Sequence, residues 1–220
     1  MAFTGWPEAA FDFYARLEVQ NTKAFWQANK AVYEAAVKAP FGELSEAVEA
    51  TYGPMYLFRP HRDVRFAKDK SPYKTAAGAV AEADGGAAHY VQVSSAGLFV
   101  GCGMYTLDSG QLDRWRRGVD HARTGAAIAD TVSMLREAGY EISAMNALKS
   151  APRGYDKAHE RIDLLRLKGL TMGKAFPYAK WMSSAKALDR ILSVWREAQP
   201  MNAWLGTHVG PSTDAPPEPD

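Results

Sequence analysis

The sequence contains one cysteine, Cys102, among its 220 residues. A single cysteine excludes an intramolecular disulfide and any metal site built from several thiolates. It lies between two glycines in an apolar run, so we expect a buried, unreactive thiol and not a nucleophile. The five histidines form no HxH, HxxxH or HExxH arrangement, and the acidic residues have no spacing that requires a metal. The sequence therefore predicts no metal site.

Long apolar runs and charge of one sign are also missing. No window approaches 18 uninterrupted apolar residues, and the first residues lack the basic and apolar segments of a signal peptide. We therefore expect a soluble, cytoplasmic protein without a membrane span. Lysine and arginine number 26 against 25 acidic residues, a net charge of +1. This balance argues against a protein that coats DNA or anionic membranes by bulk electrostatics, so any preference for anions must come from local clustering.

The common signatures of nucleotide-binding proteins and serine hydrolases do not occur. The chain has no GxxxxGK[ST] loop, no GxSxG turn, and no GxGxxG that opens a helix. We assign no cofactor and no catalytic residue, and whether the protein is an enzyme stays open.

Apolar spacing predicts helices at both ends of the chain and strands between them. The first fifty residues and those after Asp108 have helical spacing, with later helices at 111–122, after a Thr124 cap, at 162–167 and at 185–198. Short apolar runs predict strands at 55–58, 63–66, 76–81, 89–94 and 98–105. Asp84-Gly85-Gly86 indicates a hairpin turn, and residues 152–155 a second turn.

No segment is rich enough in Pro, Gly or Ser to separate two domains. We therefore predict a single α+β domain over residues 1–210, with a mainly antiparallel sheet and the N-terminal and C-terminal helices packed around it. The last residues, 211–220, hold four prolines and two aspartates, and we expect a disordered tail there.

The densest charge lies in residues 62–74, with the sequence R-D-V-R-F-A-K-D-K-S-P-Y-K. Together with Arg59, six cations face two carboxylates, a local net charge of +4 (six minus two). Unpaired charges are costly to bury, so the segment predicts either a surface or cleft that meets an anion or an internal ion-pair lattice. If residues 62–66 are extended, Asp63 and Arg65 share one face at a spacing that permits an ion pair.

This segment resembles the hallmark R-D-V-R-F-x-K-D-K-x-P-Y-K of the domain of unknown function 2461 family. The resemblance extends over most of the chain. It includes Asn21, Phe25-Trp26, Asn29-Lys30 and Tyr33, the strand Val100-Gly-Cys-Gly-Met-Tyr105, and Pro152-Arg-Gly-Tyr155. One departure is Ala67, where the family more often has serine, so a hydroxyl ligand is not available at this position. The resemblance implies the fold and the boundaries, and it implies no activity.

Three hypotheses follow. The favoured one is a small anionic, phosphate-bearing ligand in a cleft lined by the 62–74 segment, because arginine forks and lysine heads suit phosphate recognition. The second is a non-catalytic interaction module that docks on an acidic protein or on single-stranded nucleic acid, and the third is a purely structural ion-pair network. The candidate ligand-binding residues are Arg62, Asp63, Arg65, Lys68, Asp69, Lys70, Tyr73, Lys74 and Arg153.

Arg153 enters because its turn is a second compact polar segment about ninety residues from the first. Cations from two separate segments surround an anion better than cations from one loop. We therefore expect Arg153 to lie on the same face as Arg65 or Lys68, close enough for one phosphate-sized anion to bridge them. The alternative is a tight turn with solvated charges.

Overall fold

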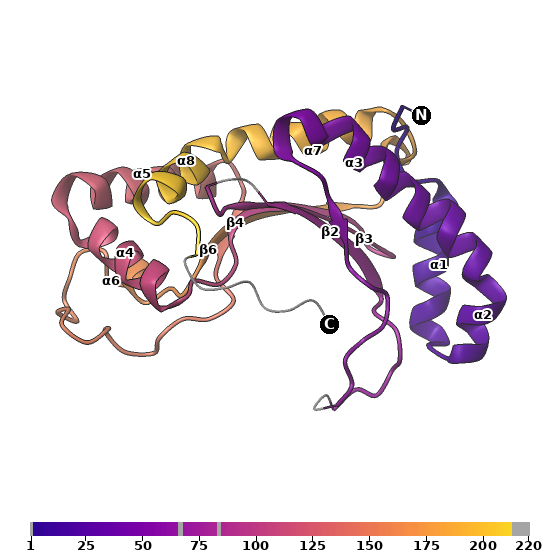
Figure 1. The fold of residues 1–220 in the computed structure, drawn as a ribbon, viewed down its shortest axis with the longest axis horizontal. Coiled ribbons are helices and arrows are strands. Elements are labelled where there is room, and N and C mark those ends of the chain that lie inside the picture. Colours follow the sequence, from indigo (N-terminus) through magenta and orange to yellow (C-terminus); the bar gives the residue numbers. More distant parts are fainter. Residues whose placement is uncertain (1, 66–67, 83–84, 213–220) are drawn as a thin grey trace. The chain divides into compact units, whose positions relative to one another are not determined.

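The computed structural model of the protein describes residues 2–65, 68–82 and 85–212. It confirms the predicted class, a single α+β domain with an antiparallel sheet (Figure 1). The six strands have the order β1-β2-β3-β4-β6-β5. Their bounds are Tyr56–Leu57 for β1, Ala76–Glu82 for β2, Ala88–Ser94 for β3, Gly97–Met104 for β4, Glu141–Ser143 for β5 and Leu170–Pro177 for β6. No described helix is long and apolar enough to cross a membrane.

Within this fold the chain forms two compact units that interleave along the sequence. The first comprises the described residues up to Glu82, with His89–Val100 and Ala175–Val194. The second comprises the described residues between 83 and 88, Gly101–Lys174, and those from Trp195 onward. The predicted limits of the domain and its tail stay predictions, and residues 213–220 lie outside the described part of the chain.

The first unit is built on helices with an aromatic core. It contains α1 (Glu8–Val19), α2 (Lys23–Val32), the π-helical turn η1 (Tyr33–Lys38), α3 (Ala39–Tyr52), the short η2 (Lys180–Ser183) and most of α7 (Lys186–Glu197). Thr22 caps α2, because its Oγ1 accepts the backbone N–H of Phe25 at 3.2 Å. The Phe13 ring packs against the rings of Phe25, Trp26 and Tyr33, so α1, α2 and η1 share one core.

The sheet of the first unit has two different faces. In β3, His89, Val91 and Val93 are buried, whereas the intervening Tyr90 and Gln92 are half-buried. Successive side chains of a strand point to opposite faces, so one face is covered and the other is open. Figure 1 shows α3 and α7 over the covered face of β2 and β3.

The second unit is mainly helical and includes the C-terminal half of β4 and the N-terminal part of β6. It contains α4 (Ser109–Asp120), α5 (Ala122–Glu137), α6 (Ile162–Leu165) and α8 (Gln199–His208). Asp108 begins α4 through a capping box, in which the Gln111 backbone N–H donates to Asp108 Oδ1 at 2.7 Å and the Asp108 N–H to Gln111 Oε1 at 3.1 Å. Trp115 is fully buried, and its Nε1–H donates to the Leu164 carbonyl at 3.1 Å, which joins α4 to α6.

Three local predictions need correction. The strands β5 and β6 were not predicted, because Gly173 and Lys174 interrupt the apolar pattern of β6 and β5 has only three residues. Residues 63–65 of the predicted strand 63–66 lie in a loop, and Phe66 lies outside the described residues. His121 caps α5 in place of Thr124, whose hydroxyl instead donates to the Gly118 carbonyl at 2.6 Å. The predicted Asp84-Gly85-Gly86 turn falls between β2 and β3, although Asp84 itself is outside the described residues.

The buried histidine His89 makes stability depend on pH. Its ring lies 4.7 Å from the Tyr52 ring, and burial lowers the pKa of His89 to about 4. In the unfolded chain an ordinary histidine has a pKa of about 6.5. The unfolded state therefore takes up a proton between about pH 6.5 and pH 4 that the folded state does not, and the folded state loses stability as the pH falls through this window.

We predict that the wild type loses up to about 3 kcal/mol of its free energy of unfolding between neutral pH and about pH 4 because of His89, and that His89→Phe does not show this loss. Urea unfolding across this range measures the effect. An equal pH dependence in wild type and His89→Phe would contradict the prediction.

Candidate functional site

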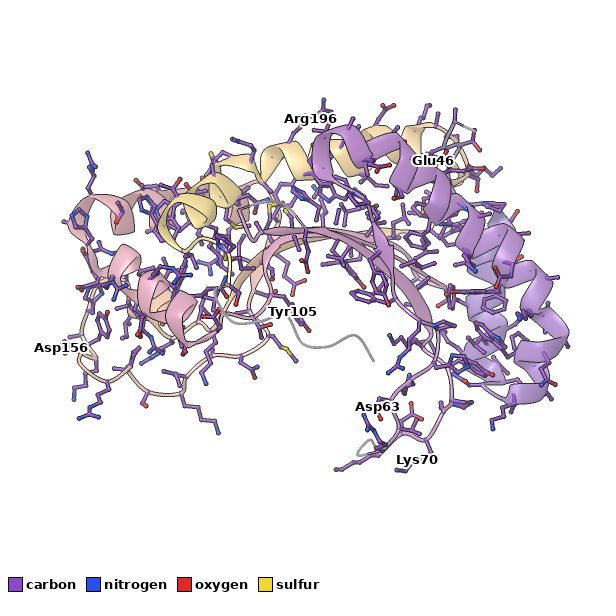
Figure 2. All side chains as sticks on the ribbon, viewed as in Figure 1. Glu46, Asp63, Lys70, Tyr105, Asp156 and Arg196 are labelled. Carbon is purple, nitrogen blue, oxygen red and sulfur yellow. The ribbon has the colours of Figure 1, made fainter. Side chains whose placement is uncertain are left out.

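The densely charged segment forms a loop between β1 and β2, which we call the charged loop (residues 59–65 and 68–74 of the described chain). Its two arms are paired at the base. His61 and Tyr73 form an antiparallel bridge, the Arg62 N–H donates to the Pro72 carbonyl at 2.9 Å, and the Lys74 N–H donates to the Pro60 carbonyl at 2.8 Å. Figure 2 shows Asp63 and Lys70 at the end of the loop that lies away from the sheet. The loop is therefore a projection with a defined base.

The base is anchored to the N-terminal helical segment by two side chains, Asn21 and Trp26. Asn21 Nδ2 donates to the Tyr73 carbonyl at 2.9 Å, and the Tyr73 N–H donates back to Asn21 Oδ1 at 3.1 Å. The Tyr73 ring is 5% exposed and stacks on the Trp26 ring, with centroids 4.3 Å apart and planes 10° from parallel. Asn21 thus satisfies both backbone groups of Tyr73, while Trp26 holds its ring.

Two ion pairs lie within the loop itself. Arg65 Nη2 lies 2.7 Å from Asp63 Oδ2, which confirms the pairing expected from their spacing. Arg62 Nη1 pairs with Asp69, and Asp69 Oδ1 also accepts the N–H and hydroxyl of Ser71 at 2.9 and 2.6 Å. Hydrogen bonds from Arg65 lower the pKa of Asp63 to about 2, and hydrogen bonds from Ser71 and then Arg62 lower the pKa of Asp69. Both carboxylates are therefore ionised at neutral pH.

The loop keeps cations available for a partner. The Arg65 side chain is 70% exposed despite its ion pair, and Lys68 and Lys70 are exposed as well. Lys70 Nζ donates to the Val64 carbonyl at 2.9 Å, which bridges the two arms. Within the described part of the chain, Arg59 and Lys68 make no ion pair. Six cations against two engaged carboxylates leave an accessible positive charge.

Lys74 occupies a different setting at the root of the loop. It is half-buried, and its ammonium lies 5.6 Å from the centre of the Phe58 ring, a cation–π contact. Burial, with a smaller contribution from Arg59, lowers the pKa of Lys74. Lys74 therefore connects the charged loop to the aromatic residue that follows β1.

The predicted turn around Arg153 is confirmed. The Tyr155 N–H donates to the Pro152 carbonyl at 3.1 Å, Gly154 has a φ of +89°, and Arg153 is exposed. Arg153 belongs to the second unit and the charged loop to the first. The two-sided clamp of Arg153 with Arg65 or Lys68 stays a prediction.

The remaining candidate chemistry is limited. Cys102 is 3% exposed and burial raises its pKa to about 12, so its thiol is protonated near neutral pH, as expected. No three His, Cys, Asp or Glu residues of the described chain group as they would around a metal ion. Cavities of about 570 and 420 Å³ lie in the first and second units, and the charged loop lines neither. A ligand cleft along the loop stays a prediction.

Sequence reasoning missed the anchoring role of Asn21 and Trp26. Both residues lie in the early segment that resembles the family, and Tyr73 lies in the hallmark segment. Asn21 and Tyr73 are separated by 52 residues in the sequence. Their contact was missed because no local pattern pairs an asparagine side chain with a distant backbone. Their joint presence in the family pattern was the available signal.

Comparison with known proteins agrees with the family resemblance seen in the sequence. Residues 9–204 match the family model described as "Conserved hypothetical protein (DUF2461)", which covers most of the chain and includes both the anchor and the charged loop. No curated protein and no solved structure shows a significant match.

We predict that Asn21→Ala destabilises the protein by about 1 to 3 kcal/mol, because it leaves two part-buried backbone groups of Tyr73 without their partner. Chemical unfolding measures the loss, and hydrogen exchange at the Tyr73 amide should accelerate. The matched control is Asn29→Ala on α2, whose side chain bonds only the Phe25 carbonyl within its own helix. Equal losses for the two variants would show that Asn21 is no special anchor.

Proposed function

We propose a function for this chain from the premise that it belongs to the DUF2461 family of conserved hypothetical proteins, whose description names no activity. The proposed function is binding of a phosphate-bearing ligand by the charged loop. The observation that carries the proposal is an exposed loop with six cations and two carboxylates on a base fixed by Asn21, Trp26 and Tyr73. We assign no reaction to the site.

The ion pairs of the loop support binding because they orient the cations before a ligand arrives. Asp63 contacts Nε and Nη2 of Arg65, which fixes the plane of the guanidinium. Asp69, on the other arm, contacts Arg62 through one guanidinium nitrogen, Nη1. A partner then meets side chains that have already lost part of their conformational freedom, which lowers the entropic cost of binding.

The exposure of the loop favours a ligand with several phosphates over a single small anion. Three cations of the loop are exposed: Arg65, Lys68 and Lys70. Separate exposed cations can each contact a different phosphate of a phosphate chain. Tyr73 takes no part in contact with the ligand in this proposal, since its ring is enclosed by Trp26. Inorganic polyphosphate is the simplest probe of this property.

We predict that Arg65→Ala weakens binding of inorganic polyphosphate about 10- to 100-fold, because a charge-assisted hydrogen bond to a phosphate is lost. Titration calorimetry measures the affinity. The control is Arg190→Ala, at an exposed arginine of α7 in the same unit. Since the Arg65–Asp63 pair is exposed, thermal unfolding of Arg65→Ala should match that of the wild type. Unchanged affinity with a sharp loss of stability would identify the loop as a structural ion-pair network.

We predict for the clamp that Arg153→Ala weakens binding of pyrophosphate and that its effect is not additive with that of Arg65→Ala. One anion held by both guanidinium groups couples the two substitutions, so a double-mutant cycle gives a nonzero interaction energy. Lys157→Ala, at an exposed lysine near the same turn, is the control. Full affinity in Arg153→Ala, or strict additivity, would eliminate the clamp and leave the charged loop as the only candidate.

A further inference from the structure

Four aromatic rings form a row across the open face of the sheet in the first unit. They come from β1, the residue after it, β3 and β4. The row is Tyr56, Phe58, Tyr90 and Phe99, with successive ring centres 5.7, 6.4 and 6.3 Å apart. Tyr56 and Phe58 are 64% and 38% exposed, and Tyr90 and Phe99 are half-buried. The row, unlike the buried rings of α1 and α2, faces solvent.

The strand register explains why these rings share a face. Tyr56 pairs with Val80 and Leu57 with Ala79, and the Phe58 N–H extends the pairing to the Gly78 carbonyl at 2.9 Å. Ala79 is fully buried on the covered side, so its neighbours Gly78 and Val80 face the open side.

Gly78 makes room for the centre of the row. A Cβ at this position would lie 2.2 Å from the Tyr90 hydroxyl and within 3 Å of two of its ring carbons. The Tyr90 ring therefore lies over the backbone of β2 in space that a side chain would occupy. The Tyr90 hydroxyl donates to Gln92 Oε1 at 3.0 Å, which fixes the ring in place. One face of the Tyr90 ring packs on β2, so a ligand can contact only its other face.

The row adjoins the root of the charged loop. Phe58 is directly followed by Arg59, the first cation of the loop, and Lys74 from the returning arm lies over the Phe58 ring. Cations and exposed rings thus follow one another along one surface. This is the combination that binds single-stranded nucleic acid, in which rings stack on bases and cations meet the phosphate chain.

We propose that the aromatic row and the charged loop together bind single-stranded nucleic acid, with bases stacked on Phe58 and its neighbours and the phosphate chain along Arg59, Lys74 and the loop. This inference rests on the proposed function, because the loop supplies the phosphate contacts. With a net charge of only +1, attraction to a phosphate chain must come from local clusters of cations such as the charged loop. A duplex fits less well, because its bases are stacked on each other and are not open to the rings.

The test uses the full chain and a fluorescent single-stranded oligonucleotide of mixed sequence, with binding followed by anisotropy. Inorganic polyphosphate and the same strand annealed to its complement are the comparison ligands. We expect the duplex to bind at least about tenfold more weakly than the single strand. Phe58→Ala and Tyr56→Ala should each weaken single-strand binding about tenfold, as loss of one stacking ring does, and Tyr56→Ala should leave polyphosphate binding unchanged.

The matched control is Tyr178→Ala. Tyr178 is 38% exposed, as is Phe58, but it contacts Phe11 at 4.7 Å and lies near the carboxylates of Glu8 and Asp12, where a phosphate chain is repelled. Its substitution should not change strand binding. Tyr56→Ala is a second test variant, and because the Tyr56 side chain is 64% exposed we expect the substitution to leave the fold intact.

The outcomes separate the two proposals. The inference is overturned if single-strand binding survives both Phe58→Ala and Tyr56→Ala, or if duplex and single strand bind equally well. In either case the proposed function still stands if polyphosphate binds. Binding of neither polyphosphate nor oligonucleotide overturns both. Loss of strand binding with intact polyphosphate binding in Tyr56→Ala supports the inference.

Discussion

The charged loop depends on the contact of Asn21 with the backbone of Tyr73. A loop with six cations repels itself and gains little from burial, so its own residues do not fix its position. The amide of Asn21 satisfies both backbone groups of Tyr73 and the Trp26 ring covers its side chain. The position of the charges in space is thus set by neutral groups at the base. The ion pairs above the base orient individual side chains and add little stability, because they are exposed.

The charged loop and the aromatic row share Phe58 and Lys74 as their meeting point. Lys74 is half-buried against the Phe58 ring, whereas Lys68 and Lys70 stand in solvent. The same surface therefore offers charges in two environments, one screened by water and one partly sheltered. Attraction at the sheltered charge is less weakened by salt than attraction at the exposed ones. The first unit alone contains all these groups.

Patterns that act over short distances were readable from the sequence. Apart from the strand expected at 63–66, the order of helices and strands up to β4 follows from apolar spacing, and Asp108 caps α4 as its position before an amphipathic run indicates. The pair of Asp63 with Arg65 follows from a spacing of two residues. What sequence reasoning could not supply depends on tertiary contact. Residues 170–177 become a strand because neighbouring strands supply partners for a pattern broken by Gly173, and Asn21 meets Tyr73 only when the helices pack.

The single buried thiol has a practical consequence for work on this protein. Cys102 is enclosed in β4 and its burial raises the pKa of the thiol, so we expect reagents that modify thiolates to leave it untouched in the folded chain. A second cysteine introduced on the surface, for example at the exposed Lys68, would be the only one to react. The native sequence is thus already a background for attaching one dye or spin label at a chosen place, with no need to replace a core residue first.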